Sequence, residues 1–246
     1  MLTALAMIAI AQETPQEGQG SVNASLLVQK MIEYYNDADT MTGTILMTTK
    51  VADQSLSIST TMQFEKPSRV YVRQQKSLGD KRVWMIVSNG KDFAYDSPGT
   101  FAWEPAGKRL AEPVTYLGVK KSFREIYAVG ATGLGDRSTP LDIAIGRTED
   151  LKYLRDQWKS VTFKGKSTHL GQEVNVVMGE WRPYGNAEVT GQYRMLITPG
   201  GELKEFARSE KIQPQGAPQA FDVVTTWTVN LKKNDRPDPN LWATVR

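Results

Sequence analysis

The sequence of 246 residues contains no cysteine and only one histidine, His169. The lack of cysteine excludes disulfides, thiolate catalysis, cysteine-based metal sites and the acceptor that bacterial lipoproteins use for their lipid anchor. A lone histidine has no second His or Cys with which to build a zinc site, and His169 lies at an apparent hairpin turn in "KSTHLGQEV". We therefore interpret His169 as a surface turn residue and expect no metal and no cofactor.

An excess of charge of one sign is also lacking. The chain has 30 Lys and Arg against 27 Asp and Glu, a formal net charge of +3. The densest basic groups, at 120–124, 164–166 and 232–233, are short and dispersed, whereas nucleic-acid-binding proteins concentrate basic residues on one surface. We expect solvated faces and no nucleic-acid partner. A hydrophobic content of 40% with 23% charged residues is typical of a soluble globular protein.

Recognisable phosphate-binding motifs are missing. Gly130, Gly133 and Gly135 follow the order GxxGxG, and no Lys-Ser or Lys-Thr comes after them. This order matches neither a P-loop nor a dinucleotide-binding fingerprint. Glycines that let a loop leave a helix explain the pattern better.

Paired carboxylates are the remaining route to catalysis, because hydrolysis of a glycosidic bond needs only two at a suitable separation. Asp92 with Asp96, or Glu180 with Glu188, would supply such a pair. Nothing in the local sequence selects them from the 27 acidic residues. We predict that the protein is not an enzyme, and a carboxylate-only enzyme stays as an alternative.

The chain begins with an apolar run, "MLTALAMIAIA", which ends in the small-x-small pattern Ala9-Ile10-Ala11. This pattern is typical of signal-peptide cleavage, and a run of about ten residues is too short to span a bilayer. The next stretch, "QETPQEGQG", has no apolar face to bury. We predict a signal peptide over 1–11, a flexible leader over 12–22 and a single domain over 23–246, exported to a bacterial periplasm without a lipid anchor.

The predicted domain opens with an amphipathic helix. Leu27, Met31 and Tyr35 recur at four-residue steps, which places them on one face, and Asn23 or Ser25 is suited to cap the first turn.

The middle of the chain predicts two further helices, over 116–130 and 140–158, around the loop "GATGLGDRSTP". Their expected buried positions are Leu141, Ile145, Leu151 and Leu154. No linker separates these helices from the segments around them.

Most of the remaining chain predicts strands. In "LSISTTMQF", residues 56–64, apolar and polar residues alternate, as expected of a strand with one buried face. Tight-turn signals such as Asn89-Gly90 and Pro199-Gly200-Gly201 indicate antiparallel pairing. The other strand-like runs are 43–50, 69–75, 82–88, 92–96, 101–104, 159–166, 173–181, 190–197, 203–211 and 221–231. The predicted fold class is α+β, mostly β: a large antiparallel sheet with an N-terminal helix and a central helical insertion.

Methionine and aromatic side chains share the parity of the apolar strand positions, as in Met62 with Phe64 and Tyr193 with Met195. They are either an ordinary core beneath helices or the wall of an apolar cavity that adapts to a flexible lipid-like ligand. Periodicity alone leaves both interpretations open.

Two segments carry a family resemblance. "MQFEKPSRVYV" at 62–72 and "MIVSNGKDFAYDSP" at 85–98 resemble the bacterial lipoprotein-carrier family LolA and its relatives, in which a strand ending in Arg-Pro, another strand and a "VSDGK…YxP" hairpin follow in this order. The first helix, the central helices and the closing segment "FDVVTTWTVNLKKNDRPDPNLW" are also similar to that group. Lys66 stands where the family has arginine and lacks its planar fork, and Asn89 replaces the usual Asp.

The resemblance implies an open, curved antiparallel half-barrel with helices as a lid over an apolar cavity. By strand parity, the expected cavity-lining residues are Leu56, Ile58, Met62, Phe64, Lys66, Val70, Val72, Tyr193, Met195 and Trp227. The resemblance further implies a monomeric periplasmic carrier or binding protein for lipid or lipoprotein acyl chains, with an inner- or outer-membrane delivery protein as a further partner. The alternative is a regulatory sensor of envelope stress that uses the same fold to bind a protein.

Overall fold

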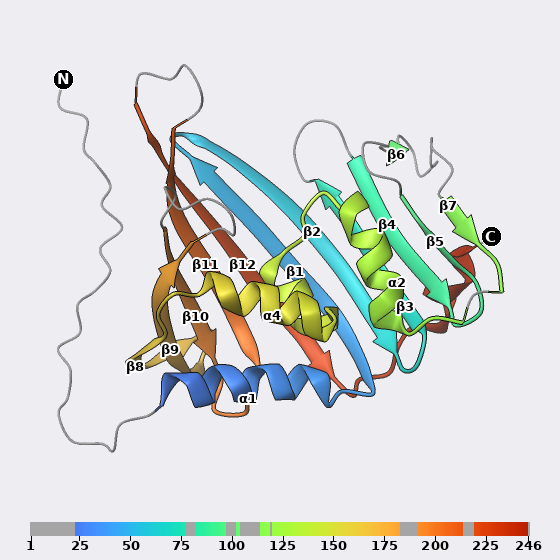
Figure 1. Cartoon of the computed structure of the whole chain (residues 1–246), viewed down its shortest axis with the longest axis horizontal. Helices are drawn as coiled ribbons and strands as arrows, with labels where there is room; N and C mark the ends of the chain where they lie inside the picture. The colour runs from blue at the N-terminus through green and yellow to red at the C-terminus, as the bar shows by residue number, and fades with distance from the viewer. Residues whose placement is uncertain are drawn as a thin grey trace.

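The computed structural model of the chain describes residues 23–76, 82–96, 102–103, 114–118, 120–182, 191–213 and 219–245. They form one twelve-stranded sheet with the order β7-β5-β4-β3-β2-β1-β12-β11-β10-β9-β8, and β6 pairs with β4 outside this path (Figure 1). Every pairing is antiparallel, and no pairing between the end strands β7 and β8 is seen in the described ranges. The sheet is therefore open, as predicted.

The eleven strand-like runs predicted from the sequence all contain strands, and β7 is additional. The strands are β1 (Thr40–Val51), β2 (Gln54–Glu65), β3 (Arg69–Lys76), β4 (Arg82–Asn89), β5 (Phe93–Tyr95), β6 (Ala102–Trp103), β7 (Val114–Tyr116), β8 (Thr162–His169), β9 (Gln172–Trp181), β10 (Gly191–Ile197), β11 (Leu203–Ile212) and β12 (Phe221–Lys233).

In the described ranges, four helices lie against one face of the sheet, which we call the inner face (Figure 1). They are α1 (Ala24–Asn36), α2 (Phe123–Gly130), α3 (Thr139–Ile145) and α4 (Thr148–Gln157), with the short 3-10 helix η2 (Ala131–Gly133) between α2 and α3. A second 3-10 helix, η3 (Pro239–Val245), lies on the opposite, outer face. There Trp242 packs with Tyr71, Val87 and Ala94 in a small separate core.

The first helix begins as the sequence predicts. Of the two candidate caps, Asn23 is the one used, because its side chain accepts a hydrogen bond from the Ser25 amide at 2.9 Å. Met31 and Tyr35 are buried, while Leu27 is only partly so. The predicted signal peptide, 1–11, and leader, 12–22, lie outside the described residues.

The predicted helix over 116–130 is too long at its start. Tyr116 belongs to β7, and the helix begins at Phe123. A capping box decides this boundary: the Ser122 side chain accepts from the Glu125 amide, and the Glu125 carboxylate accepts from the Ser122 amide. Residues before Ser122 cannot join a helix that starts there.

The predicted helix over 140–158 is in fact two helices, α3 and α4, separated at Gly146. Gly146 is extended, and a Cβ placed on it would lie 2.3 Å from the Asp142 carbonyl oxygen. The four predicted core positions, Leu141, Ile145, Leu151 and Leu154, are buried. No helix within the described ranges has the length and hydropathy required to cross a bilayer.

Candidate functional site

The ten residues expected to line a cavity fall into two groups. Nine lie on the inner face, in or against one continuous apolar core: Leu56, Ile58, Met62, Phe64, Val70, Val72, Tyr193, Met195 and Trp227. The register brings Met62 opposite Val72 on the neighbouring strand, and Phe64 opposite Val70. Their role as a ligand surface stays a prediction.

Lys66 lies apart from the other nine. It follows the last residue of β2 and is exposed, and its Nζ lies 3.5 Å from Asp39 Oδ1 and donates to the Asn36 carbonyl at 3.2 Å. In this structure Lys66 joins the end of α1 to the β2–β3 turn instead of pointing into the apolar wall.

Helix side chains cover the inner face. The Phe123 ring of α2 stacks on Phe64 of β2, with centroids 4.5 Å apart, and Met31 of α1 is fully buried in the same core. The grooves on the described surface include one of about 480 Å³ between α1 and α4 and one of about 300 Å³ across the ends of β9 to β12. None of the ten predicted residues lines either groove.

The two segments that resemble the LolA family meet in space. The Ser88 hydroxyl donates to the Ser68 carbonyl at 2.9 Å, and the Ser68 hydroxyl donates to the Gly90 carbonyl at 3.3 Å. The Pro67 carbonyl accepts the Phe123 amide at 2.9 Å, which fixes the start of α2. The motif therefore has a structural role, because it joins the β2–β3 turn, the β4–β5 turn and the first covering helix.

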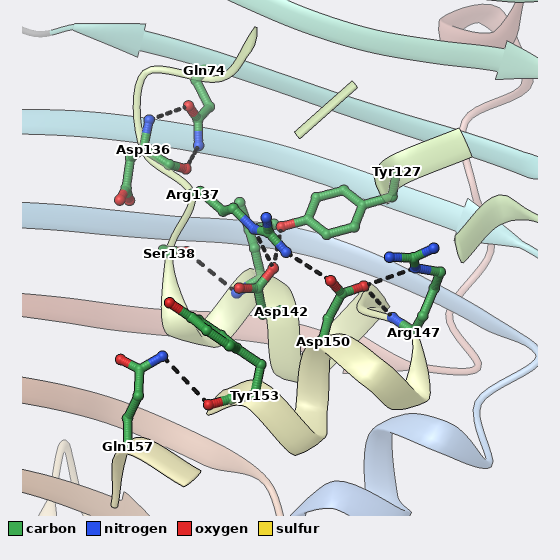
Figure 2. A network of polar contacts seen from close by, with 11 residues as sticks. Gln74, Tyr127, Asp136, Arg137, Ser138, Asp142, Arg147, Asp150, Tyr153 and Gln157 are labelled. Atoms are coloured by element: carbon green, nitrogen blue, oxygen red, sulfur yellow. Dashed lines mark hydrogen bonds and ion pairs between the residues drawn. The ribbon is translucent and has the colours of Figure 1, made fainter. Parts of the chain in front are cut away.

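A network of charged side chains ties α2, α3 and α4 into one body (Figure 2). The Arg137 guanidinium lies 2.8 Å from Asp150 and 3.3 Å from Asp142, and Arg147 lies 3.1 Å from Asp150. The Tyr127 hydroxyl donates to Asp142 at 2.9 Å. We call α2 to α4, with the loop between α2 and α3, the helical cover.

Burial and the arginine charges act against each other in this network. Burial raises the pKa of Asp142, and the neighbouring Arg137 charge offsets this only in part. For Asp150, burial acts in the same direction, but hydrogen bonds from Arg147 and the Arg137 charge outweigh it and lower the pKa. The arginines therefore favour the ionised form of both carboxyl groups.

The helical cover is held to the sheet by a second polar contact, at Asp136 (Figure 2). The Asp136 amide donates to the Gln74 side chain at 2.8 Å, and the Gln74 amide group donates to the Asp136 carbonyl at 2.6 Å. The Trp227 indole donates to the Asp136 carboxylate at 2.9 Å. Burial raises the pKa of Asp136 to about 6, against the Trp227 hydrogen bond and the Arg208 charge.

Arg208 is a further charged residue on the inner face, on β11. Its guanidinium carbon lies 4.1 Å from the ring centre of Trp181 and 5.7 Å from that of Trp227. It contacts Glu210 at 3.4 Å, and its buried Nε has no hydrogen-bond partner among the described atoms.

The sequence prediction missed Gln74, Asp136 and Arg208. The available signal was a polar residue at an inward strand position, as in Gln74, which lies two residues after Val72 on β3 and is fully buried. No such signal existed for Asp136, because it lies in the loop between α2 and α3.

Of the acidic residues considered for catalysis, Asp92 and Asp96 are bound by backbone amides. The Asp96 carboxylate accepts a hydrogen bond from the Met85 amide at 2.7 Å, and the Asp92 carboxylate accepts one from the Gly118 amide at 2.9 Å. Both side chains therefore hold backbone segments in place. Glu180 is exposed on β9, and its proposed partner at position 188 lies outside the described ranges.

The histidine lies where the sequence predicts. His169 ends β8 at the β8–β9 hairpin. Within the described residues no group of His, Cys, Asp and Glu is arranged to hold a metal ion.

Comparison with known proteins gives structural likeness only. No protein-family model matches the sequence, and no curated protein sequence matches it. The structure is similar to that of the Mycobacterium tuberculosis lipoprotein LppX, with 8% identity, 87% of this chain and 97% of that chain covered, and a TM-score of 0.43. It is similar to MucB, with 14% identity, 91% and 63% coverage and a TM-score of 0.44.

A LolA superfamily protein from Nitrosomonas europaea is also similar, with 10% identity, 88% of this chain and 96% of that chain covered, and a TM-score of 0.30. At such identities the likeness concerns the fold alone. The structure itself has the open antiparallel sheet with helices on one face that the sequence resemblance implies.

Proposed function

We propose that the protein binds the acyl chain of a lipid or lipoprotein against the inner face of the sheet and carries it through the periplasm. The observation that supports this is the continuous apolar wall from β3 to β10, which in the described ranges is covered by short helices and not by a second sheet. Each buried methylene contributes about 0.8 kcal/mol, so a chain of about fourteen carbons contributes on the order of 10 kcal/mol before ordering costs.

Binding in this proposal requires the helical cover to move. Its helices have 8, 7 and 10 residues, lengths at which an isolated helix is marginal, so packing on the sheet holds them in place. The Arg137 network lets α2, α3 and α4 move as one body. An acyl chain would then replace helix side chains against Met62 and Met195, whose unbranched thioethers adapt to irregular shapes.

Displacement of a fluorescent fatty acid by unlabelled lipids tests the proposal. Met62→Glu places a charge on the inner wall and should abolish binding, whereas Thr61→Glu, one residue away on the exposed outer face, should leave binding unchanged. If Met62→Glu fails to fold, Val72→Thr makes a milder polar change on the same wall and should weaken binding. Wild-type protein that binds no fatty acid, and shows no lipid in native mass spectrometry, would contradict the proposal.

A second candidate function is binding of a protein partner at the groove between α1 and α4. Ile32 and Leu151 supply apolar surface there, and Lys152, Arg155 and Asp156 supply charges. The partner-binding proposal predicts that Ile32→Asp abolishes co-purification of an envelope protein while fatty-acid binding persists. Wild-type protein that retains no partner would leave lipid binding as the sole candidate.

A further inference from the structure

The inner face changes character along its strands. On β12, the inward positions run from Leu231, Val229 and Trp227, which pack in one core with the helices, through the polar Thr225 to the buried Val223. Beside Thr225 on β11 is Arg208. The inner wall is therefore mainly apolar, with a polar position at Thr225 and Arg208 toward the β1–β2 turn. A ligand with an acyl chain and a polar head suits this arrangement.

Arg208 has unused hydrogen-bonding capacity. A guanidinium carries five N–H donors, yet the described residues offer it one ion pair, to Glu210 at a long 3.4 Å, and its buried Nε is unpartnered. The rings of Trp181 and Trp227 hold the group in place, and its side chain is 25% exposed. An anionic oxygen is the ligand group that would satisfy these donors.

Within the described part of the chain, the Asp136 carboxylate lacks a paired cation, whereas the Arg208 guanidinium lacks a hydrogen-bond acceptor for its Nε. Its carboxylate accepts a hydrogen bond from the Trp227 indole at 2.9 Å, and no Lys or Arg among the described residues pairs with it within 4.0 Å. Gln74 holds its backbone with two hydrogen bonds, so the carboxylate is fixed in position. Burial of this charge is unfavourable, as its raised pKa indicates. An ammonium group is the ligand group that would compensate it.

Both groups contact the same indole: Asp136 bonds the Trp227 nitrogen, and Arg208 lies over the Trp227 ring. We propose that Arg208 and Asp136 form a headgroup site for a zwitterionic amphiphile, with its phosphate oxygens on Arg208 and its ammonium on Asp136. A purely anionic head would face the two acids Asp136 and Glu210, and a purely cationic head would face Arg208. This site rests on the proposed binding of an acyl chain to the same wall.

Competition with a fluorescent fatty acid tests the site. The probes are lysophosphatidylethanolamine, lysophosphatidylglycerol and a free fatty acid of equal chain length, together with glycerophosphoethanolamine, which has the head and no chain. Wild-type protein should bind the lysophosphatidylethanolamine about tenfold more tightly than the other two amphiphiles, because it alone pairs both charges. The chain-free head should not compete, since the acyl chain supplies most of the binding.

Two variants separate the charges. Arg208→Gln should weaken both lysophospholipids about tenfold, while Asp136→Asn should weaken only the lysophosphatidylethanolamine, since only its ammonium meets the carboxylate. Lys211→Gln, on the exposed outer side of the same strand, is the matched control and should change nothing. If Arg208→Gln does not fold, Arg208→Lys, which keeps the charge and loses the planar fork, should show the same loss in weaker form.

The outcomes distinguish the two proposals. Equal affinity for the three amphiphiles, or variants that match wild type, would overturn the headgroup site and leave acyl-chain binding intact. If no amphiphile binds the wild-type protein, acyl-chain binding fails and the headgroup site fails with it.

Discussion

The two faces of the central strands differ sharply although they share one backbone. On β1, Ile45 is fully buried beneath the helices, while the adjacent Thr44 is exposed on the outer face opposite Thr61 of β2. On the inner face the Phe64 ring stacks against Phe123 of α2. The main core therefore lies on the apolar face that the strand alternation creates, and the helices cover that same face.

A second difference lies within the inner face itself. Most inward positions are apolar, but Gln74, Asp136 and Arg208 bring polar groups to the same side. Asp136 and Arg208 contact Trp227, and Gln74 binds the backbone of Asp136. Polar residues on an otherwise apolar wall are costly unless partnered, and for this reason the headgroup site that we propose lies at this part of the wall.

The largest expected contrast is between the two faces of the sheet. Phe64→Ala removes a fully buried ring that joins β2 to α2 and should lower the free energy of unfolding by about 3–5 kcal/mol. Thr44→Ala, on the exposed outer face, should change it by less than about 0.5 kcal/mol. Urea unfolding measures both; similar losses for the two variants would show that the inner face is not the main core.

The next effect concerns pH and the contact between helical cover and sheet. The pKa of Asp136 is raised to about 6 from its ordinary 3.8. This carboxyl therefore stabilises the fold most below pH 3.8, and its contribution falls as the pH rises from there through 6. The free energy of unfolding falls by at most about 3 kcal/mol over this pH range. The decrease is smaller if solvent partly screens the carboxyl group.

Asp136→Asn should therefore remove this part of the pH dependence. The difference in free energy of unfolding between variant and wild type should grow in favour of the variant from about pH 4 to about pH 7. Thermal unfolding at a series of pH values measures it. A difference that is constant with pH would show that the Asp136 carboxyl is not perturbed by burial.

A smaller contrast compares one ion-pair network on the inner side with one pair on the outer side. Arg137→Met leaves Asp142 and Asp150 without their shared cation and should cost about 1–3 kcal/mol, with faster amide exchange in α3 and α4. Arg194→Met removes a single pair with Glu205 and should cost less than about 1 kcal/mol. Equal amide exchange in α3 and α4 in the Arg137 variant and wild type would contradict the role of the network.

The smallest effect on stability is expected at Lys66, which follows the last residue of β2 at the edge of the inner face. Lys66 and Asp39 form an ion pair at 3.5 Å in which the Asp39 side chain is 85% exposed. Lys66→Ala should therefore change the free energy of unfolding by less than about 0.5 kcal/mol and leave fatty-acid binding unchanged. A loss of binding would place Lys66 in the ligand site, as its position in the family motif predicts.

Much of the architecture could be predicted because it follows local rules. The alternation in 56–64 placed Met62 and Phe64 on one face, and the strand register confirms that they meet Val72 and Val70. The helix boundaries were less predictable from the spacing of apolar residues. The start of α2 depends on the Ser122–Glu125 capping box, and the break between α3 and α4 depends on the extended Gly146. Neither feature changes the spacing of apolar residues. The predicted ligand role of the inner wall stays a prediction.

Which residues share a face of the sheet follows from the order of amino acids alone, because side-chain direction in a strand repeats every two residues and needs no knowledge of the partner strand. The meeting of Arg208 of β11, Trp227 of β12 and Asp136 of the helical cover arises only in the folded chain, where 91 positions separate Asp136 from Trp227. Such meetings depend on strand register and on the path of a loop across the sheet, which are set by packing among distant segments and not by local periodicity.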